Sequence, residues 1–235
     1  MMTPAPRTCI APGSIAIPRD LAPLLDHTVL RPEASEDDVA RACDEALEHG
    51  FAGVCVREVH LALVVRRLGG HGPVPIAVAD FPCGTGPAAK RAEETRRLAD
   101  LGAREVDVVY PRPALAACAH AAALRDLEAV VRAAGGAAVK VILETGALTT
   151  AEKGAACAIA KAAGAAFVKT STGFGPGGAT EEDVALLRSL VGGDTGVKAS
   201  GGIRTAADAL RMVRAGANRV GASASVAIVT GAFGW

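Results

Sequence analysis

Short apolar runs alternate with longer amphipathic stretches along the chain from residue 24 onward. Each run is rich in Val, Ile, Leu or Ala, lacks strict alternation with polar residues, and ends at Gly, Ser, Thr or Pro. Such runs are typical of strands that are covered on both faces. They predict eight strands, at residues 24–28, 52–56, 75–81, 105–110, 138–144, 167–172, 197–200 and 219–222.

The stretches between these runs carry helix start and stop signals. Four of them begin with a hydroxyl residue that is followed three positions later by a carboxylate, which is the pattern of a helix N-cap. These N-cap residues are Ser35, Thr149, Thr180 and Thr205. Glycines stand where the helices are expected to stop, at Gly50, Gly102, Gly135, Gly164 and Gly216, because glycine readily ends a helix.

Eight strands that alternate with helices predict an α/β fold, a single-domain TIM (β/α)8 barrel. We expect the barrel to span residues 20–235, after a loose, proline-containing N-terminal tail at residues 1–19. An open, doubly wound sheet is the alternative. No GxGxxG motif follows the first strand, which argues against the dinucleotide-binding form of that sheet.

Composition excludes several classes of function. The 235 residues carry a formal net charge of zero, and 3% of them are aromatic, so we expect no nucleic-acid partner. No apolar run is long enough to suggest a membrane span, and residues 1–19 do not resemble a signal peptide. The six cysteines form no CxxC pair, and the five histidines are scattered. We therefore expect a reduced, cytoplasmic protein without a metal site.

Two lysines stand near the ends of neighbouring predicted strands. Lys169 and Lys198 are 29 residues apart, and each lies in an apolar run that leads into Ser and Gly. A buried lysine is costly to keep charged, and a second cation nearby favours loss of its proton. Such an amine is a nucleophile that forms Schiff bases with carbonyl compounds. The alternative is that each lysine reaches from its strand end to solvent.

Carboxylates in other strands complete a candidate catalytic site. Asp107 lies between valines in the fourth strand and is a candidate general acid/base, or else a structural partner of a lysine. Asp26 precedes His27 and Thr28 in the first strand and is placed to orient a lysine or a substrate hydroxyl. In the fifth strand, Lys140 and Glu144 form a candidate buried ion pair.

Glycine-rich turns follow the seventh and eighth strands. Gly201 and Gly202 lead into the helix capped by Thr205, and Gly221 and Ser223 lead into the last helix. Backbone N–H groups in such turns approach anions closely, and barrels often bind phosphate with these two loops. The sequence therefore predicts a phosphate site here.

Several stretches together resemble the deoxyribose-phosphate aldolase family of class I aldolases. They include LDHT at 25–28, GFAGVCV at 50–56, FPCG at 81–84, EVDVV at 105–109, KVILET at 140–145, FVKTSTGF at 167–174, VKASGGIR at 197–204 and RVGAS at 219–223. The resemblance runs from residue 24 to about residue 230. The lysine-containing motifs, in this order and spacing, are highly specific.

The resemblance implies that Lys169 forms the Schiff base, that Lys198 lowers its pKa and that Asp107 transfers protons. It also implies contacts with the substrate or its phosphate at Asp26, Thr28, Cys55, Thr170, Gly173, Gly201, Gly202, Gly221 and Ser223. The implied reaction is reversible cleavage of 2-deoxy-D-ribose 5-phosphate to D-glyceraldehyde 3-phosphate and acetaldehyde, in deoxyribonucleoside catabolism. No cofactor or metal is implied, and a homo-oligomer, dimer or tetramer, is expected.

Some positions depart from the family pattern. Arg57 and Glu58 stand where many relatives have a proline-containing turn, and Cys83 stands where His or Leu is frequent. The chain ends at Trp235 rather than at the tyrosine that some relatives carry. Cys55 is either a small core residue or a pocket residue. Two other functions stay open, namely another Schiff-base phosphosugar aldolase and a phosphosugar-binding barrel without turnover.

Overall fold

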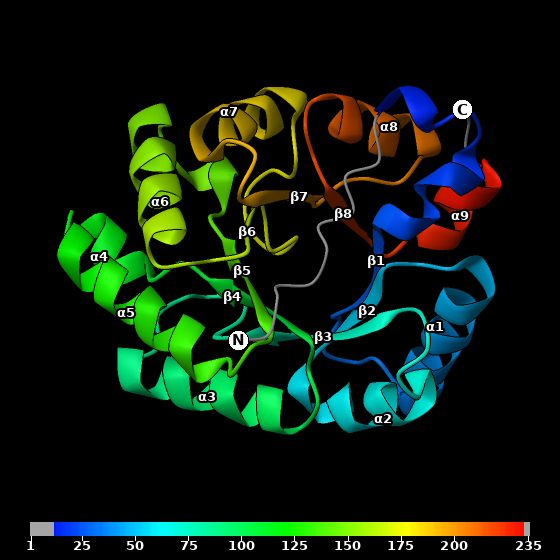
Figure 1. Ribbon diagram of the computed structural model, residues 1–235, viewed down its shortest axis with the longest axis horizontal. Coiled ribbons are helices and arrows are strands. Elements are labelled where there is room, and N and C mark those ends of the chain that lie inside the picture. The colour runs from blue at the N-terminus through cyan, green and yellow to red at the C-terminus, as the bar shows by residue number, and fades with distance from the viewer. Residues whose placement is uncertain (1–11, 233–235) are drawn as a thin grey trace.

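The chain forms a closed barrel of parallel strands, as the sequence predicts (Figure 1). The structure is a computed structural model that describes residues 12–232. Each strand pairs in parallel with the next, and β8 closes the barrel on β1. The strands are β1 Leu25–Val29, β2 Gly53–Val56, β3 Val74–Ala79, β4 Glu105–Val109, β5 Ala138–Ile142, β6 Phe167–Lys169, β7 Gly196–Ser200 and β8 Arg219–Ala222.

All eight strands lie where the apolar runs predict them, but β3, β4, β5 and β6 end one to three residues earlier. Strands β3 and β5 stop just before Asp80 and Glu144, which have φ angles of 47° and 62°. A left-handed backbone turns the chain out of the sheet, and side chains other than glycine rarely adopt it. Strand β6 ends at Lys169, so the polar residues that follow form a loop rather than a strand extension.

Helices surround the barrel (Figure 1). They are α1 Glu36–His49, α2 Glu58–Leu68, α3 Ala88–Asp100, α4 Arg112–Ala116, α5 His120–Ala133, α6 Thr150–Ala162, α7 Glu181–Val191, α8 Ala206–Arg214 and α9 Ser225–Thr230, with 3-10 helices η1 Pro12–Ser14, η2 Pro18–Leu24 and η3 Thr145–Ala147. Ser35, Thr149 and Thr205 each form the predicted reciprocal capping box. Thr180 accepts from the Asp183 N–H without the reciprocal bond, because Asp183 pairs with Lys153 Nζ at 2.5 Å.

Residues 12–19 belong to the segment predicted as a loose tail, but they make defined turns. They include η1 and the start of η2, and Ile15 is buried in the main core. Helix η2 packs against α8 and α9. The rest of the predicted tail, residues 1–11, and Trp235 lie outside the described residues.

The interior of the barrel is divided into an apolar part and a charged part. The main core lies between the strands and the helices and consists mostly of Val, Leu and Ala. A separate apolar cluster contains Leu30, Cys55, Ile76 and Val78, packed against Val74 and Phe81. We call it the apolar wall. Seven of the other inward-facing strand positions carry buried charges, which are described below.

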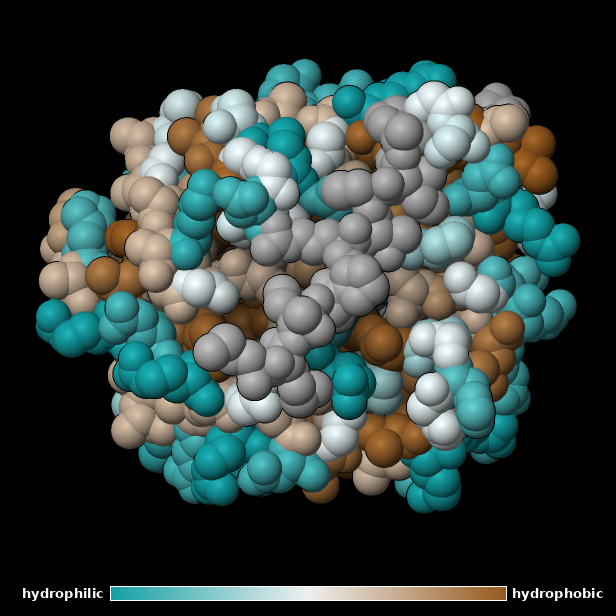
Figure 2. Space-filling model, in the orientation of Figure 1, coloured by the Kyte–Doolittle hydropathy of each residue, from teal (hydrophilic) through white to brown (hydrophobic). Residues whose placement is uncertain are grey.

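The outer surface is mostly polar over several helices. On the face shown in Figure 2, hydrophilic side chains gather at the periphery around α3. Within residues 12–232, no helix combines the length and the apolar character that a membrane crossing requires.

Candidate active site

A pocket of about 380 Å³ opens at the carboxyl ends of β1, β6, β7 and β8. This is the end of a barrel where catalytic residues are normally found. Its lining includes Thr28, Val29, Leu30, Arg31, Lys169, Thr172, Gly173, Phe174, Ser200, Gly201, Gly202, Ile203, Arg204, Gly221, Ala222 and Ser223. Lys169 therefore reaches the pocket, whereas Lys198 and Asp107 lie behind its lining.

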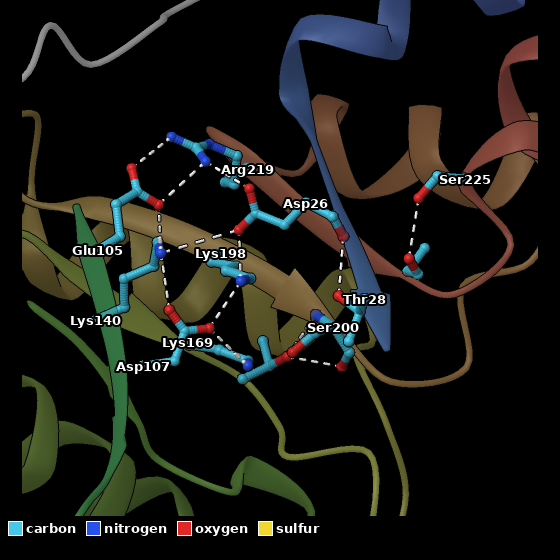
Figure 3. Close-up of polar contacts among 12 residues, drawn as sticks. Asp26, Thr28, Glu105, Asp107, Lys140, Lys169, Lys198, Ser200, Arg219 and Ser225 are labelled. Carbon is cyan, nitrogen blue, oxygen red and sulfur yellow. Dashed lines mark hydrogen bonds and ion pairs between the residues drawn. The ribbon is translucent and has the colours of Figure 1, made fainter. Parts of the chain in front are cut away.

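The carboxylate of Asp107 contacts three lysines (Figure 3). Its Oδ2 atom lies 2.9 Å from Lys169 Nζ and 2.7 Å from Lys198 Nζ. Its Oδ1 atom accepts a hydrogen bond from Lys140 Nζ at 2.7 Å. The sequence predicted that Lys169 and Lys198 approach each other, and the structure brings both amines to one carboxylate oxygen.

The contacts of Asp107 are part of a larger buried network, here called the interior cluster. Lys140 Nζ also lies 2.5 Å from Glu105 Oε2, and Lys198 Nζ lies 2.5 Å from Asp26 Oδ2. The guanidinium of Arg219 contacts both of these carboxylates, at 2.5 Å from Asp26 Oδ1 and 3.0 Å from Glu105 Oε1. The interior cluster consists of Asp26, Glu105, Asp107, Lys140, Lys169, Lys198 and Arg219 (Figure 3).

Strand register explains why these side chains meet. Inward-facing residues alternate along a strand, so Glu105 and Asp107 share the interior face of β4. Asp107 pairs with Lys140 of β5, and Lys198 of β7 lies between Lys169 of β6 and Arg219 of β8. Buried charges cost least when every one of them has a partner, and in this cluster each carboxylate contacts at least two cations.

Lys169 differs from its neighbours in the direction of its pKa shift. Burial, together with the charge of Lys198, outweighs the attraction of Asp107 and lowers the pKa of Lys169 below the ordinary lysine value. Burial acts on Lys198 in the same direction, but Asp107 and Asp26 outweigh it and raise the pKa of Lys198. Burial opposes the charged form of Asp107, yet the surrounding lysines hold its pKa well below the usual range.

The predicted ion pair between Lys140 and Glu144 is wrong. Lys140 contacts Asp107 and Glu105 instead. Glu144 lies beyond the end of β5 with a left-handed backbone, so its side chain leaves the interior face. Its Oε2 atom accepts a hydrogen bond from Thr172 Oγ1 at 2.6 Å, and its Oε1 atom accepts one from the Thr172 N–H at 3.2 Å.

Glycines pack the loop between β6 and α7 against its neighbours. A Cβ atom on Gly175 would lie 2.6 Å from the Glu144 carboxyl carbon, and one on Gly178 would lie 2.5 Å from the carbonyl oxygen of Gly201. A Cβ atom on Gly146 would likewise collide with the carbonyl oxygen of Pro176, which belongs to this loop. The loop that carries Thr172, Gly173 and Phe174 into the pocket is thus held on both sides.

Most of the residues predicted to contact substrate line the pocket. They are Thr28, Gly173, Gly201, Gly202, Gly221 and Ser223. Asp26 instead belongs to the interior cluster. Thr170 is outside the lining, where its hydroxyl donates to the Ser200 carbonyl at 3.0 Å and ties β6 to β7. Cys55 is buried in the apolar wall, and burial raises its pKa to about 11, so its thiol is neutral at physiological pH.

Gly221 has a second role besides lining the pocket. A Cβ atom at this position would lie 3.0 Å from Lys198 Cε and 3.1 Å from Ser200 Cβ. The absence of a side chain therefore leaves room for the stem of Lys198 on its way to Asp107. This reason for a glycine does not depend on an anion.

Sequence reasoning missed Glu105 and Arg219 as members of the site. Glu105 stands two residues before Asp107, and Arg219 two residues before Gly221. Residues two apart share one face of a strand, so this parity was the available signal. A charged residue at an inward-facing position of a buried strand requires a partner, and here Arg219 and Glu105 contact each other.

The family model of the DeoC/LacD family aldolases matches residues 21–233 of this sequence. The chain belongs to the DeoC/LacD aldolase family. The match includes the whole barrel and every residue of the interior cluster. The family resemblance inferred from the motifs is confirmed.

Relatives and solved structures agree with this family. The chain is 49% identical over 215 residues to the deoxyribose-phosphate aldolase of Halalkalibacterium halodurans, covering 91% of this chain and 96% of that protein. A structure described as a putative deoxyribose-phosphate aldolase from Coccidioides immitis superimposes with a TM-score of 0.88 at 42% identity, covering 90% of this chain and 85% of that one. The tetrameric deoxyribose phosphate aldolase from Aeropyrum pernix gives 0.86 at 33% identity and 97% coverage of both chains.

Proposed function

We propose that the chain is a class I aldolase that reversibly cleaves 2-deoxy-D-ribose 5-phosphate to D-glyceraldehyde 3-phosphate and acetaldehyde. The observation that carries this proposal is the amine of Lys169, which is 3% exposed, lines the pocket and has a lowered pKa. A neutral amine at the end of a pocket is the nucleophile that Schiff-base chemistry requires. The names of the relatives supply the substrate.

Charge counting within the interior cluster explains why Lys169 is the base that gives up its proton. The cluster contains three carboxylates and four basic groups. Three bases are enough to neutralise the carboxylates, so the fourth gains least from being charged. Of the four bases in this cluster, Lys169 alone has a lowered pKa.

In the proposed reaction, the neutral amine of Lys169 attacks the aldehyde carbon of the open-chain sugar and forms a carbinolamine. Protonation of the carbinolamine oxygen and loss of water give an iminium ion. Removal of the proton from the 3-hydroxyl breaks the bond between C2 and C3, and its electron pair moves into the iminium to give an enamine. Glyceraldehyde 3-phosphate leaves, the enamine takes a proton at carbon, and water releases acetaldehyde from Lys169.

Asp107 and Lys198 are placed to move the protons in this sequence. Asp107 Oδ2 lies within hydrogen-bond distance of both Lys169 Nζ and Lys198 Nζ. A proton that leaves one amine therefore has an acceptor that is already in contact with the other. General acid/base catalysis requires such contact at hydrogen-bond distance.

We expect Lys198→Leu to move the acid limb of the pH–rate profile to higher pH. The variant loses a positive charge next to Lys169, so the pKa of Lys169 rises and the amine stays protonated in neutral buffer. Activity near neutral pH falls steeply, and part of it returns in alkaline buffer. The measurement is kcat/KM for deoxyribose 5-phosphate against pH. An acid limb that stays in place would contradict the coupling of the two lysines.

The other end of the pocket is proposed to hold the phosphate. Gly201, Gly202, Gly221 and Ser223 line it in the loops that follow β7 and β8. Gly202 has a φ of 79°, and a Cβ atom there would meet no atom within 4 Å, so this backbone borders open space in the pocket. Arg204 adds a positive charge to the same lining. Exposed N–H groups beside a cation suit a phosphate dianion.

We expect Gly202→Val to weaken binding of deoxyribose 5-phosphate by about 2–3 kcal/mol, because the new side chain keeps the anion away from the backbone N–H groups. Turnover of unphosphorylated 2-deoxyribose should change little. The measurement is the ratio of kcat/KM for the two sugars. Gly135→Val is the matched control, since Gly135 also has a positive φ and open space but lies outside the pocket lining. A ratio that changes equally in both variants would place the phosphate elsewhere.

Two assays test the proposed function. The first couples deoxyribose 5-phosphate cleavage to detection of glyceraldehyde 3-phosphate, and we expect turnover. The second adds borohydride in the presence of acetaldehyde, and we expect a covalent adduct on Lys169. An adduct without cleavage of this sugar would indicate another Schiff-base aldolase. Binding without an adduct would indicate a phosphosugar-binding barrel. A homo-oligomeric assembly and a cytoplasmic location remain predictions.

A further inference from the structure

Two charged members of the interior cluster lie on the opposite side of it from Lys169. Glu105 and Arg219 contact each other and do not line the pocket (Figure 3). They therefore have no place in the reaction steps described above. Burying an arginine and a glutamate inside a barrel costs free energy, so their presence calls for a reason beyond the filling of space.

Contacts run without a gap from Arg219 to the amine of Lys169. One route passes through Glu105, Lys140 and Asp107, with contacts of 3.0, 2.5, 2.7 and 2.9 Å in that order. The other passes through Asp26 and Lys198 to the same Asp107 oxygen. No member of the cluster has a side chain more than 11% exposed. Charges in such a buried site are screened far less than charges at a surface.

We propose that Arg219 and Glu105 are positioning residues that set the proton occupancy of Lys169 through the charge balance of the interior cluster. This inference rests on the proposed function, in which Lys169 reacts as a neutral amine. The two residues act through Asp26, Lys140, Lys198 and Asp107 rather than by touching substrate.

The proposal predicts opposite effects for the loss of either residue. Without the charge of Arg219, three carboxylates face two cations, and a proton on Lys169 restores neutrality. Without the charge of Glu105, two carboxylates face three cations, and a proton on Lys169 is disfavoured further. A role in packing alone does not give opposite signs, because both losses would disturb the same contacts.

The groups that face Lys169 directly stay the same in both cases. They are Asp107 on β4, Lys198 on β7 and Cys55 on β2. Cys55 contributes no charge at physiological pH, since burial raises its pKa to about 11. Any change in Lys169 therefore comes from the distant charge.

The experiment compares Arg219→Met with Glu105→Gln. The readout is the acid limb of kcat/KM for deoxyribose 5-phosphate, which reports essential groups of the free enzyme. We expect the limb to move up by about one pH unit in Arg219→Met and down by a similar amount in Glu105→Gln. A pKa shift of about this size is what removal of one unit charge, separated from Lys169 by several side chains, produces at an intermediate dielectric constant. Titration of the substrate phosphate is common to all variants and does not affect the difference between them.

Three further variants separate charge from structure. Arg219→Lys keeps the charge and should keep the parent limb, although it loses the forked contact. The double variant Glu105→Gln/Arg219→Met has two carboxylates and two other cations, and its limb should return to the parent position. Arg214→Met removes an exposed arginine outside the interior cluster and should leave the limb where it is.

A second readout measures the amine of Lys169 without turnover. Reductive methylation with formaldehyde and cyanoborohydride, followed by mass spectrometry, gives the pH dependence of its labelling. The same opposite shifts are expected. Borohydride trapping on the parent tests the proposed function, so an adduct on Lys169 with no shift in either single variant would overturn only the charge-balance proposal. Circular dichroism checks folding, and if Arg219→Met does not fold, Glu105→Gln and the double variant decide the question.

Discussion

Lys169→Ala is expected to reduce cleavage of deoxyribose 5-phosphate to below about one hundredth of the parent rate, since removing a covalent nucleophile abolishes the route on which catalysis depends. Trapping with borohydride and acetaldehyde should also fail. The fold should remain, because Lys140, Lys198 and Arg219 are enough to neutralise the three carboxylates of the interior cluster without Lys169. Activity, trapped adduct and thermal unfolding are measured on the same preparation.

The control for this prediction is Lys90→Ala, which removes an exposed lysine of α3. It should leave turnover and trapping unchanged. Activity above about one hundredth of the parent in Lys169→Ala would remove Lys169 from the role of nucleophile. An adduct that persists in this variant would mean that another lysine forms the imine.

Asp107→Asn is expected to affect both catalysis and stability. The amide cannot accept a proton, so exchange of acetaldehyde hydrogens with solvent deuterium should fall by about 10²-fold or more. The amide also leaves three lysines around a neutral group, which breaks a buried charge network and should cost about 3–5 kcal/mol of unfolding free energy. NMR follows the exchange, and urea unfolding gives the stability.

Asp126→Asn is the matched control for Asp107→Asn. Asp126 is also buried beside a cation, and its carboxylate lies 2.9 Å from Arg91 Nε, outside the interior cluster. Its loss should lower stability while leaving deuterium exchange near the parent level. Normal exchange in Asp107→Asn would show that Asp107 has only a structural role. Equal stability of Asp107→Asn and the parent would contradict the charge counting.

The sequence predicted the barrel and its reactive end because both follow from local rules. Apolar runs mark the strands, and hydroxyl caps such as Ser35 and Thr149 mark the helix starts. Two lysines in buried strands indicate chemistry wherever the fold brings them together. The barrel brings Lys169 and Lys198 together because β6 and β7 are neighbours.

The partners of the charges could not be predicted in the same way. Lys140 and Glu144 were predicted to pair because they are close in sequence. Glu144 itself has a left-handed backbone beyond the strand end, and its side chain contacts Thr172 instead. Arg219 contacts Glu105 across the barrel, although the two residues are 114 positions apart along the chain. Such a contact depends on closure of the sheet and on register, which no local pattern of a single sequence fixes.

The division of the barrel interior into an apolar wall and a charged cluster has a consequence for how new specificities arise. Leu30 belongs to the apolar wall, Phe174 to the loop after β6, and both line the pocket without touching the charges that govern Lys169. Substitutions at these two positions can reshape the space offered to an aldehyde while the nucleophile keeps its reactivity. Selection, natural or in the laboratory, can therefore explore new substrates here without first having to rebuild the catalyst.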